Sequence, residues 1–341
     1  MTPTAAGPVW FRLAVCLYGV SFALVPARGR AQEDGTATST DPDGGYRAKA
    51  RVSEPPKEGE TFSEVETVKL EQNLGDAFSI VESLAGVVPV FSGVPYLIIR
   101  GATPAGSLNY YDGLELPALF HVALGPSVID QHLLGPLHYY PGDAPARYDA
   151  HIGGIVEREG PDPSALRTPE RSIKLTLLDV SAYLNIPTDD GSLSIAWRYG
   201  DPGLILSALN LKATLSYYNY EVRYETAIAP HTRVLLLALG DGDSLGDRTS
   251  PKDDISLSFH RLLARITHRQ GDLSFGAQLV LGADGSTLGH ELNGRAERVD
   301  PSLYAEWKKR DTRLRVGVNL MGALARLKRG PDTTTGIEAS R

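Results

Sequence analysis

The feature that most constrains this sequence is a strict alternation of polar and apolar side chains in its second half. From about residue 171 onward, long segments joined by Gly, Asp and Pro turns place successive side chains on opposite faces of a strand. Residues 191–200 set one apolar face against a more polar one: Leu193, Ile195, Trp197 and Tyr199 against Ser194, Ala196 and Arg198. The pattern returns in residues 218–228, 272–282 and 313–321, and it predicts antiparallel strands with two different faces.

Two architectures produce this alternation, a soluble β-sandwich and a transmembrane β-barrel. Strands of a sandwich average five or six residues and turn their polar face to water. The strands here run to about ten residues, the length that a tilted strand needs to cross a membrane. Their polar faces are heavily charged and their apolar faces carry several tyrosines, which favours the barrel over the sandwich. A slip of phase at residues 260–263 predicts a β-bulge or a strand end.

The first 31 residues have the pattern of a signal peptide. Arg12 precedes an apolar run at residues 13–25, and Gly29 and Ala31 occupy the −3 and −1 positions of a cleavage site. The run has about 13 residues, whereas a spanning helix needs about 20. No later segment is suited to a spanning helix, so we expect an exported protein that, if integral, is a barrel. A buried or interfacial helix is the alternative reading of the run.

A polar tail and a small domain precede the alternating strands. Residues 32–61 contain almost no apolar side chains, which predicts a mobile tail. Residues 62–160 combine a helix at 71–84 with short strands at 96–100, 108–111, 137–140 and 152–157. About 100 residues suffice for a domain with its own core.

Several motifs occur in order within this small domain. They are Leu74-Gly75-Asp76-Ala77 through Leu84-Ala85-Gly86-Val87, then Leu97-Ile98-Ile99-Arg100-Gly101, the hairpin Tyr111-Asp112-Gly113-Leu114-Glu115-Leu116-Pro117, and Tyr140-Pro141-Gly142 with Ala146-Arg147-Tyr148 and Gly153-Gly154. In this order and spacing they resemble the plug of the TonB-dependent outer-membrane receptors over residues 65–160. The resemblance implies a mainly β fold, in which a small α/β plug domain is followed by antiparallel transmembrane β-barrel strands.

The sequence departs from the family pattern at two places. Asp149 stands where the family has glycine after the tyrosine, and Gly142 is followed by Asp143 and Ala144.

The sequence also departs from the family in the length of its barrel. The family's barrel has about 22 strands, whereas residues 171–327 supply about eight to ten. Residues 328–341 form a polar tail rather than a final barrel strand. We therefore expect an incomplete barrel, from a truncated product or a fragment, or else an unusual small barrel.

No constellation of catalytic or metal-ligating residues is evident. The eight histidines lack a metal spacing such as His-Glu-x-x-His, and the one cysteine, Cys16, lies in the signal segment. Residues 240–243 resemble part of a calcium loop but lack its other ligands, which favours a surface turn. The net charge of −7 gives no sign of a nucleic-acid partner. We expect no enzymatic activity, no cofactor and no bound metal.

The resemblance implies three sets of functional residues. Outward plug loops supply the candidate ligand-binding set: Phe91, Ser92, Thr103, Pro104, Phe120 and His121. Plug charges would face the barrel lumen and need partners there, namely Arg100, Arg147 and Asp112, together with Glu82 and Asp130. Ordinary salt bridges within the domain are the alternative for these charges. A strand-like segment would contact TonB by adding to its sheet, unless it is plain linker: Tyr46, Arg47, Ala48, Lys49, Ala50, Arg51 and Val52.

We therefore expect an outer-membrane receptor for energy-coupled uptake of a scarce ligand such as a siderophore, cobalamin or an oligosaccharide. Its partners would be a TonB-type protein of the inner membrane, outer-membrane lipid and the small extracellular ligand. A non-transporting remnant with a plug, or a surface ligand-binding module, is the main alternative. A secreted β-sandwich binding protein is a third.

Overall fold

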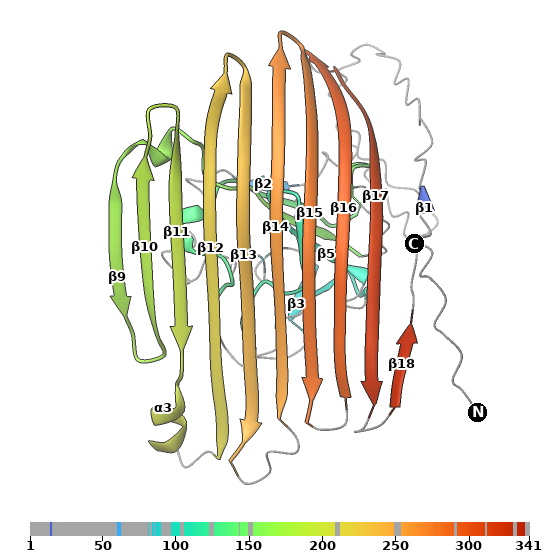
Figure 1. Cartoon of the computed structure of the whole chain (residues 1–341). Coiled ribbons are helices and arrows are strands. Elements are labelled where there is room, and N and C mark those ends of the chain that lie inside the picture. The colour runs from blue at the N-terminus through green and yellow to red at the C-terminus, as the bar shows by residue number, and fades with distance from the viewer. Residues whose placement is uncertain are drawn as a thin grey trace, which may run out of the picture.

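The structure, a computed structural model, is mainly β (Figure 1). It describes residues 14–15, 60–62, 81, 84, 86–89, 97–102, 106–122, 126–142, 144–148, 153–208, 212–248, 254–289, 292–310, 312–329 and 333–337. These residues form one large sheet and two small ones. Within these ranges no helix is both long enough and apolar enough to cross a membrane.

The large sheet is a run of nine antiparallel strands, each paired with the next along the chain. They are β9 (Glu170–Leu175), β10 (Asp179–Pro187), β11 (Gly191–Gly200), β12 (Ala213–Ala229), β13 (Thr232–Asp247), β14 (Ile255–Gln270), β15 (Leu273–Leu288), β16 (Leu292–Lys309) and β17 (Thr312–Arg329). Two short strands, β1 (Ala14–Val15) and β18 (Thr333–Ile337), pair with β17. Among the described strands, β9 does not pair with this far edge, so the sheet is open. The expected eight to ten strands are confirmed.

The strands are longer than the alternation predicted. Strands β12 to β17 each have 16 to 18 residues, against the expected ten or so. A strand rises about 3.3 Å per residue, so these strands reach well beyond the part whose side chains alternate strictly. A short helix, α3 (Gly203–Ala208), lies between β11 and β12. Strand β18 falls inside the segment expected to be a polar tail.

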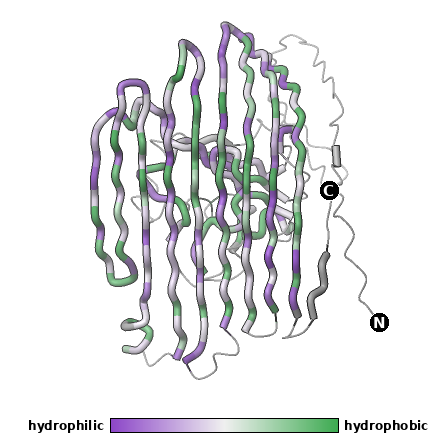
Figure 2. The backbone as a smooth tube through the Cα atoms, viewed as in Figure 1, coloured by the Kyte–Doolittle hydropathy of each residue, from purple (hydrophilic) through white to green (hydrophobic). Residues whose placement is uncertain are grey.

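The two faces of the large sheet differ in the way the alternation predicted. On the outer face, apolar side chains are open to the surroundings, with Trp197 44% and Leu279 40% exposed. On the inner face, Asn219, Glu221 and Arg223 are buried. Figure 2 shows hydrophobic and hydrophilic residues alternating along the long strands. Soluble proteins bury apolar groups and expose charged ones, so this sheet has the opposite polarity.

Tyrosines of the large sheet cover glycines on the neighbouring strand. Four such pairs are direct cross-strand partners: Gly200 with Tyr217, Gly242 with Tyr218, Gly240 with Tyr220, and Gly276 with Tyr304. A Cβ atom at any of these glycines would lie 2.1 to 2.5 Å from an atom of that ring. The missing side chain therefore leaves the space that the ring fills, which helps to fix the register of the strands.

The small domain lies against one face of the large sheet (Figure 1). Its main sheet has the order β2-β7-β8-β5-β6, and a separate pair is β3-β4. The bounds are β2 (Glu60–Phe62), β3 (Val87–Pro89), β4 (Leu97–Ile99), β5 (Leu108–Tyr111), β6 (Leu114–Leu116), β7 (Leu137–Tyr140) and β8 (Ile155–Arg158), with 3-10 turns η2 (Gln131–Leu133) and η3 (Ala165–Arg167). The expected strands 108–111 and 137–140 are confirmed. Of the expected helix 71–84, only Val81 and Leu84 are described, and both are buried.

Two turns of the small domain explain why their motifs contain glycine. Arg100 and Gly101 have φ of 51° and 77°, and Asp112 and Gly113 have φ of 49° and 76°. Two successive residues with positive φ characterise the tight hairpin turn that Asp-Gly favours. The Asp112-Gly113 turn joins β5 to β6 and directs Asp112 at the large sheet.

Two expectations from the sequence are wrong. Strand β14 runs through residues 260–263 without a bulge, and the register shift in the neighbouring ladder of β12 and β13 lies between Ala227 and Ala229. The apparent slip arises because Phe259 and Leu263 face inward and pack in the core shared with the small domain. Residues 240–243 are not a surface turn, because they lie within β13, where Asp241 and Asp243 are buried.

Candidate functional site

The small domain and the inner face of the large sheet share one apolar core. Leu114, Leu116 and Leu119 of the small domain belong to the same buried cluster as Leu237 and Leu263 of the sheet. Fully burying a leucine contributes about 1.5 to 3 kcal/mol relative to leaving it exposed. This shared core is the apolar part of the attachment between the small domain and the sheet, and polar contacts make up the rest.

Five arginines reach from the inner face of the sheet to the small domain. Two of them bind Asp112: the carboxylate accepts a hydrogen bond from Arg223, and its main-chain oxygen accepts one from Arg265. Burial alone would raise the pKa of Asp112, but the charges of Arg223 and Arg265 outweigh it and hold this pKa below its ordinary value. Asp112 is therefore ionised and tied to two strands of the sheet, β12 and β14.

The other three arginines bind main-chain or carboxylate oxygens of the small domain. Arg298 donates to Glu115 Oε2 at 2.8 Å and to Asp300 at 2.6 Å. Arg198 donates to the main-chain oxygen of Ser127 at 2.8 Å, and Arg261 donates to that of Glu115 at 3.3 Å. Four strands, β11, β12, β14 and β16, thus each contribute cations to one domain. Arginine suits this task because its planar group presents several fixed donors.

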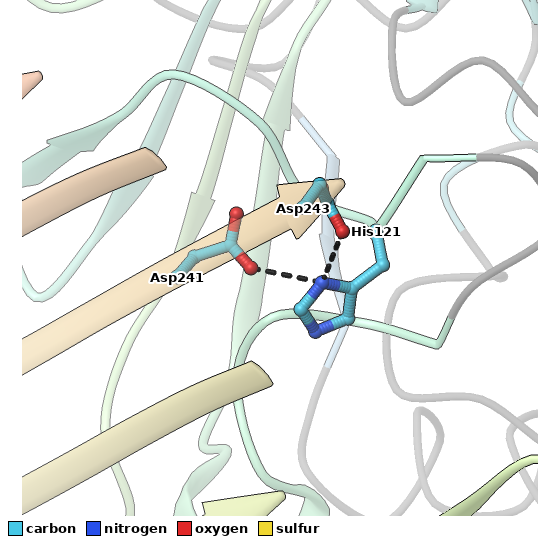
Figure 3. A group of neighbouring side chains, drawn as sticks. All are labelled: His121, Asp241 and Asp243. Carbon is cyan, nitrogen blue, oxygen red and sulfur yellow. Dashed lines mark hydrogen bonds and ion pairs between the residues drawn. The ribbon is translucent and has the colours of Figure 1, made fainter. Parts of the chain in front are cut away.

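A separate cluster joins His121 of the small domain to two aspartates of β13. Figure 3 shows the imidazole between Asp241 and Asp243, with Nδ1 2.8 Å from Asp241 Oδ1 and 2.9 Å from Asp243 Oδ1. The other ring nitrogen, Nε2, lies 3.1 Å from Asn219 Oδ1. Burial would lower the pKa of His121, but the two carboxylates beside Nδ1 raise it to about 9. All three residues are buried.

The plug charges expected to face the sheet behave differently from one another. Asp112 bridges to the sheet as expected. Arg147 is paired inside the small domain, where it donates to Glu157 at 2.8 Å. Arg100 lies exposed in the turn after β4, and Asp130 bonds to His132 at 2.6 Å. Glu82 lies outside the described residues. For Arg147, the observed ion pair is that of the alternative, a salt bridge within the domain.

The candidate ligand-binding and TonB-contacting residues are mostly outside the described part of the chain. This holds for Phe91, Ser92, Thr103, Pro104 and the whole segment 46–52. Phe120 is half-buried and packs on the shared core, and His121 is buried against β13. Neither side chain lies on an open surface of this structure.

Sequence reasoning missed the sheet side of the interface. It predicted a polar inner face, but it did not single out Arg223, Arg265 or Arg298, and it interpreted Asp241 and Asp243 as part of a surface turn. The signal present in the sequence is the charge at inward positions of the alternating strands. Arg223, for example, lies between Val222 and Tyr224, which point to the other face of the strand. Which small-domain residue each charge meets depends on tertiary packing across more than 100 residues of chain.

We expect Asp112→Asn to weaken the attachment of the small domain to the sheet. Removing one partner of a buried ion pair costs about 3–5 kcal/mol, and here Glu225, 2.8 Å from Arg223, retains part of that energy. Urea unfolding of the folded chain in detergent measures the loss. Asp162→Asn is the matched control, because Asp162 is exposed and its carboxylate accepts a hydrogen bond from Ser164 in its own turn.

The same pair predicts how attachment depends on pH. Because the folded-state pKa of Asp112 is depressed, its contribution is complete above the ordinary carboxylate pKa of about 3.9 and is lost as pH falls through the folded value. The difference between wild type and Asp112→Asn should therefore be constant from about pH 5 to pH 8 and shrink in stronger acid. A difference that grows on acidification would contradict this assignment.

Comparison with known proteins identifies the fold. No protein-family model and no curated protein matches the sequence. Among solved structures, the chain is similar to the alcaligin outer-membrane receptor FauA of Bordetella pertussis, with 14% identity, 81% of this chain and 49% of that chain covered, and a TM-score of 0.57. The copper transporter OprC matches with 12% identity, coverage of 82% and 48%, and a TM-score of 0.55.

A third similar structure is the pyoverdine outer-membrane receptor FpvA of Pseudomonas aeruginosa, with 10% identity, coverage of 80% and 47%, and a TM-score of 0.54. The chain thus spans about half the length of the solved structures that it matches. Because 80–82% of this chain is covered, the likeness includes the small domain as well as the large sheet. The chain therefore has the fold of the TonB-dependent outer-membrane receptors, with a plug and a nine-stranded part of the barrel.

Proposed function

We propose that this chain acts in the outer membrane as a receptor for energy-coupled, TonB-dependent uptake of a scarce small ligand. The observation that carries the proposal is the polarity of the large sheet, whose apolar side chains are exposed and whose charged side chains are buried beneath a plug. A lipid bilayer is the solvent in which that outer face is favourable. A secreted β-sandwich would instead turn its charged face to water.

The plug supplies a reason for transport rather than simple surface binding. A domain held on the inner face by separate hydrogen bonds and ion pairs on several strands can shift when some of them break and the others remain. We propose that a TonB-type protein supplies the force, through an added strand formed by residues 46–52. The ligand would then pass along the inner face into the periplasm.

The ligand class is proposed from the similar structures. Their names refer to alcaligin, pyoverdine and copper, which supports a metal or a metal-carrying compound of the siderophore class. Cobalamin and oligosaccharides remain within the proposal, because a likeness of 10 to 14% identity concerns the fold. The candidate ligand contacts remain a prediction; they are Phe91, Ser92, Thr103, Pro104, Phe120 and His121.

The membrane assignment is tested by placing an arginine on either face of β15. Leu279→Arg puts a charge on the apolar outer face, at a cost of about 2–4 kcal/mol near the middle of the membrane. Ser274→Arg, the control, puts the same residue on the inner face beside Glu306. We expect Leu279→Arg to reduce the amount of protein recovered in the outer-membrane fraction, and Ser274→Arg to leave it unchanged. Equal recovery of both variants would refute a lipid-facing outer surface.

The role of TonB is tested by deleting residues 46–52. We expect the deletion to abolish binding of the full chain to the periplasmic domain of a TonB-type protein, because the strand that would be added is gone. Deletion of residues 33–39, which come from the same polar tail, is the length-matched control. Binding that survives the first deletion as well as the second would show that this segment is plain linker.

A further inference from the structure

We propose that His121, Asp241 and Asp243 form a binding site for a divalent first-row transition metal such as Zn²⁺, which joins the plug to strand β13. This inference needs only the contact between plug and sheet, so it does not depend on the transport proposal. Nothing in the spacing of these residues along the sequence suggests it. His121 lies 120 positions before Asp241 and in a different domain.

The three candidate ligand atoms lie close together. One atom from each residue, His121 Nδ1 and a carboxylate oxygen of each aspartate, lies within 4.8 Å of the other two. In tetrahedral coordination, ligand atoms about 2.0–2.2 Å from a zinc ion lie about 3.3–3.6 Å from one another. The two distances from Nδ1, 2.8 and 2.9 Å, are those of hydrogen-bonded ion pairs, so each oxygen would move about 0.5 Å away from Nδ1 to admit the ion. Imidazole nitrogen with carboxylate oxygen is a donor set suited to Zn²⁺ and its neighbours.

One oxygen in the cluster has no hydrogen bond of its own. Nδ1 can carry one proton, which can point at one carboxylate, and the hydrogen bond formed is with Asp243. Asp241 Oδ1 lies equally near, but it is a buried atom for which the described residues provide no hydrogen-bond partner. Asp241 is 2% exposed, so water does not compensate easily. A cation in place of the Nδ1 proton would satisfy both carboxylates at once.

Charge balance points the same way. Two carboxylates that face each other in a buried place are costly to ionise without a cation between them. Two carboxylates, a neutral imidazole and a divalent cation sum to zero. The ion would displace a proton from Nδ1, so binding would release protons.

The surroundings of the ligands are built as in established metal sites. A metal-binding histidine usually donates its second ring N–H to an oxygen acceptor, and Nε2 of His121 has Asn219 Oδ1 at 3.1 Å. The second oxygen of Asp243 accepts a hydrogen bond from the main-chain N–H of Val122 at 3.2 Å. The main chain of His121 is itself fixed, because its N–H donates to Pro126 at 3.0 Å. The ring of Tyr217 packs against the imidazole at 4.5 Å between centroids.

The site would act as a clamp between plug and sheet. Its ligands come from both parts, so a bound ion opposes their separation. Asn219 adds a third contribution from β12, beside β13. Removal of the metal, or its capture by a competing chelator, would loosen the plug without altering the arginine contacts elsewhere on the inner face.

The test is an isothermal calorimetric titration. Zn²⁺ is added to the full chain after the chain has been folded in detergent and stripped of metal. We expect one saturable Zn²⁺ site per chain, which Mg²⁺ does not occupy. His121→Ala and Asp241→Asn should abolish this binding, and Asn219→Ala should weaken it about 10–100-fold. His138→Ala is the matched control, because His138 lies 2.9 Å from the carboxylate of Glu159 and, among the described residues, belongs to no group of three metal-ligating side chains.

Several results would overturn the proposal. They are the absence of a saturable site, equal binding of Mg²⁺ and Zn²⁺, and a loss in His138→Ala as large as that in His121→Ala. Any of them would mean that the cluster is an ion-paired imidazolium only. If His121→Ala does not fold, Asn219→Ala decides the question, since it keeps all three ligands and changes only the support of the imidazole. Unchanged Zn²⁺ affinity in Asn219→Ala would then count against the site.

Discussion

The structure depends on the pairing of buried charge on the inner face of the large sheet. Arginines at inward positions of β11, β12, β14 and β16 would be very costly to cover with an apolar layer. The plug covers them with carboxylates and main-chain oxygens instead, as at Asp112, Glu115 and Ser127. Because the charges are satisfied inside, the outer face is free to be apolar, which is what a bilayer requires.

The same pairing sets what the plug can do. Its attachment has an apolar centre and separate polar contacts on several strands, so loss of one contact leaves the others in place. Asp112 ties the β5–β6 turn to β12 and β14, while His121 ties a different loop to β13. A plug held at separate points can move in part without leaving the sheet. Attachment at separate points is compatible with the proposed transport role, in which the plug moves in part.

Much of the architecture was predictable because strand alternation has a period of two, which identifies strands and their faces directly. Strand β11 and the hairpin at Asp112-Gly113 follow from local sequence alone. Strand lengths were underestimated, because the ends of β12 to β17 alternate less strictly. The apolar residues Phe259 and Leu263 were interpreted as a slip of phase, because the inner face was expected to be polar along its whole length. These side chains instead pack against the plug. The partners of Asp112 and His121 were not predictable, because they depend on how two domains pack.

The central claim is that the outer face of the sheet meets lipid, and Trp197 reports on it directly. Its side chain is 44% exposed on that face, and indoles are quenched by brominated lipid only on contact. The measurement is the tryptophan fluorescence of the chain folded into vesicles of brominated lipid, compared with the Trp197→Phe variant. We expect brominated lipid to quench the emission that Trp197 contributes, and aqueous acrylamide not to quench it. Quenching of that emission by acrylamide alone would show that the outer face meets water and would contradict the account.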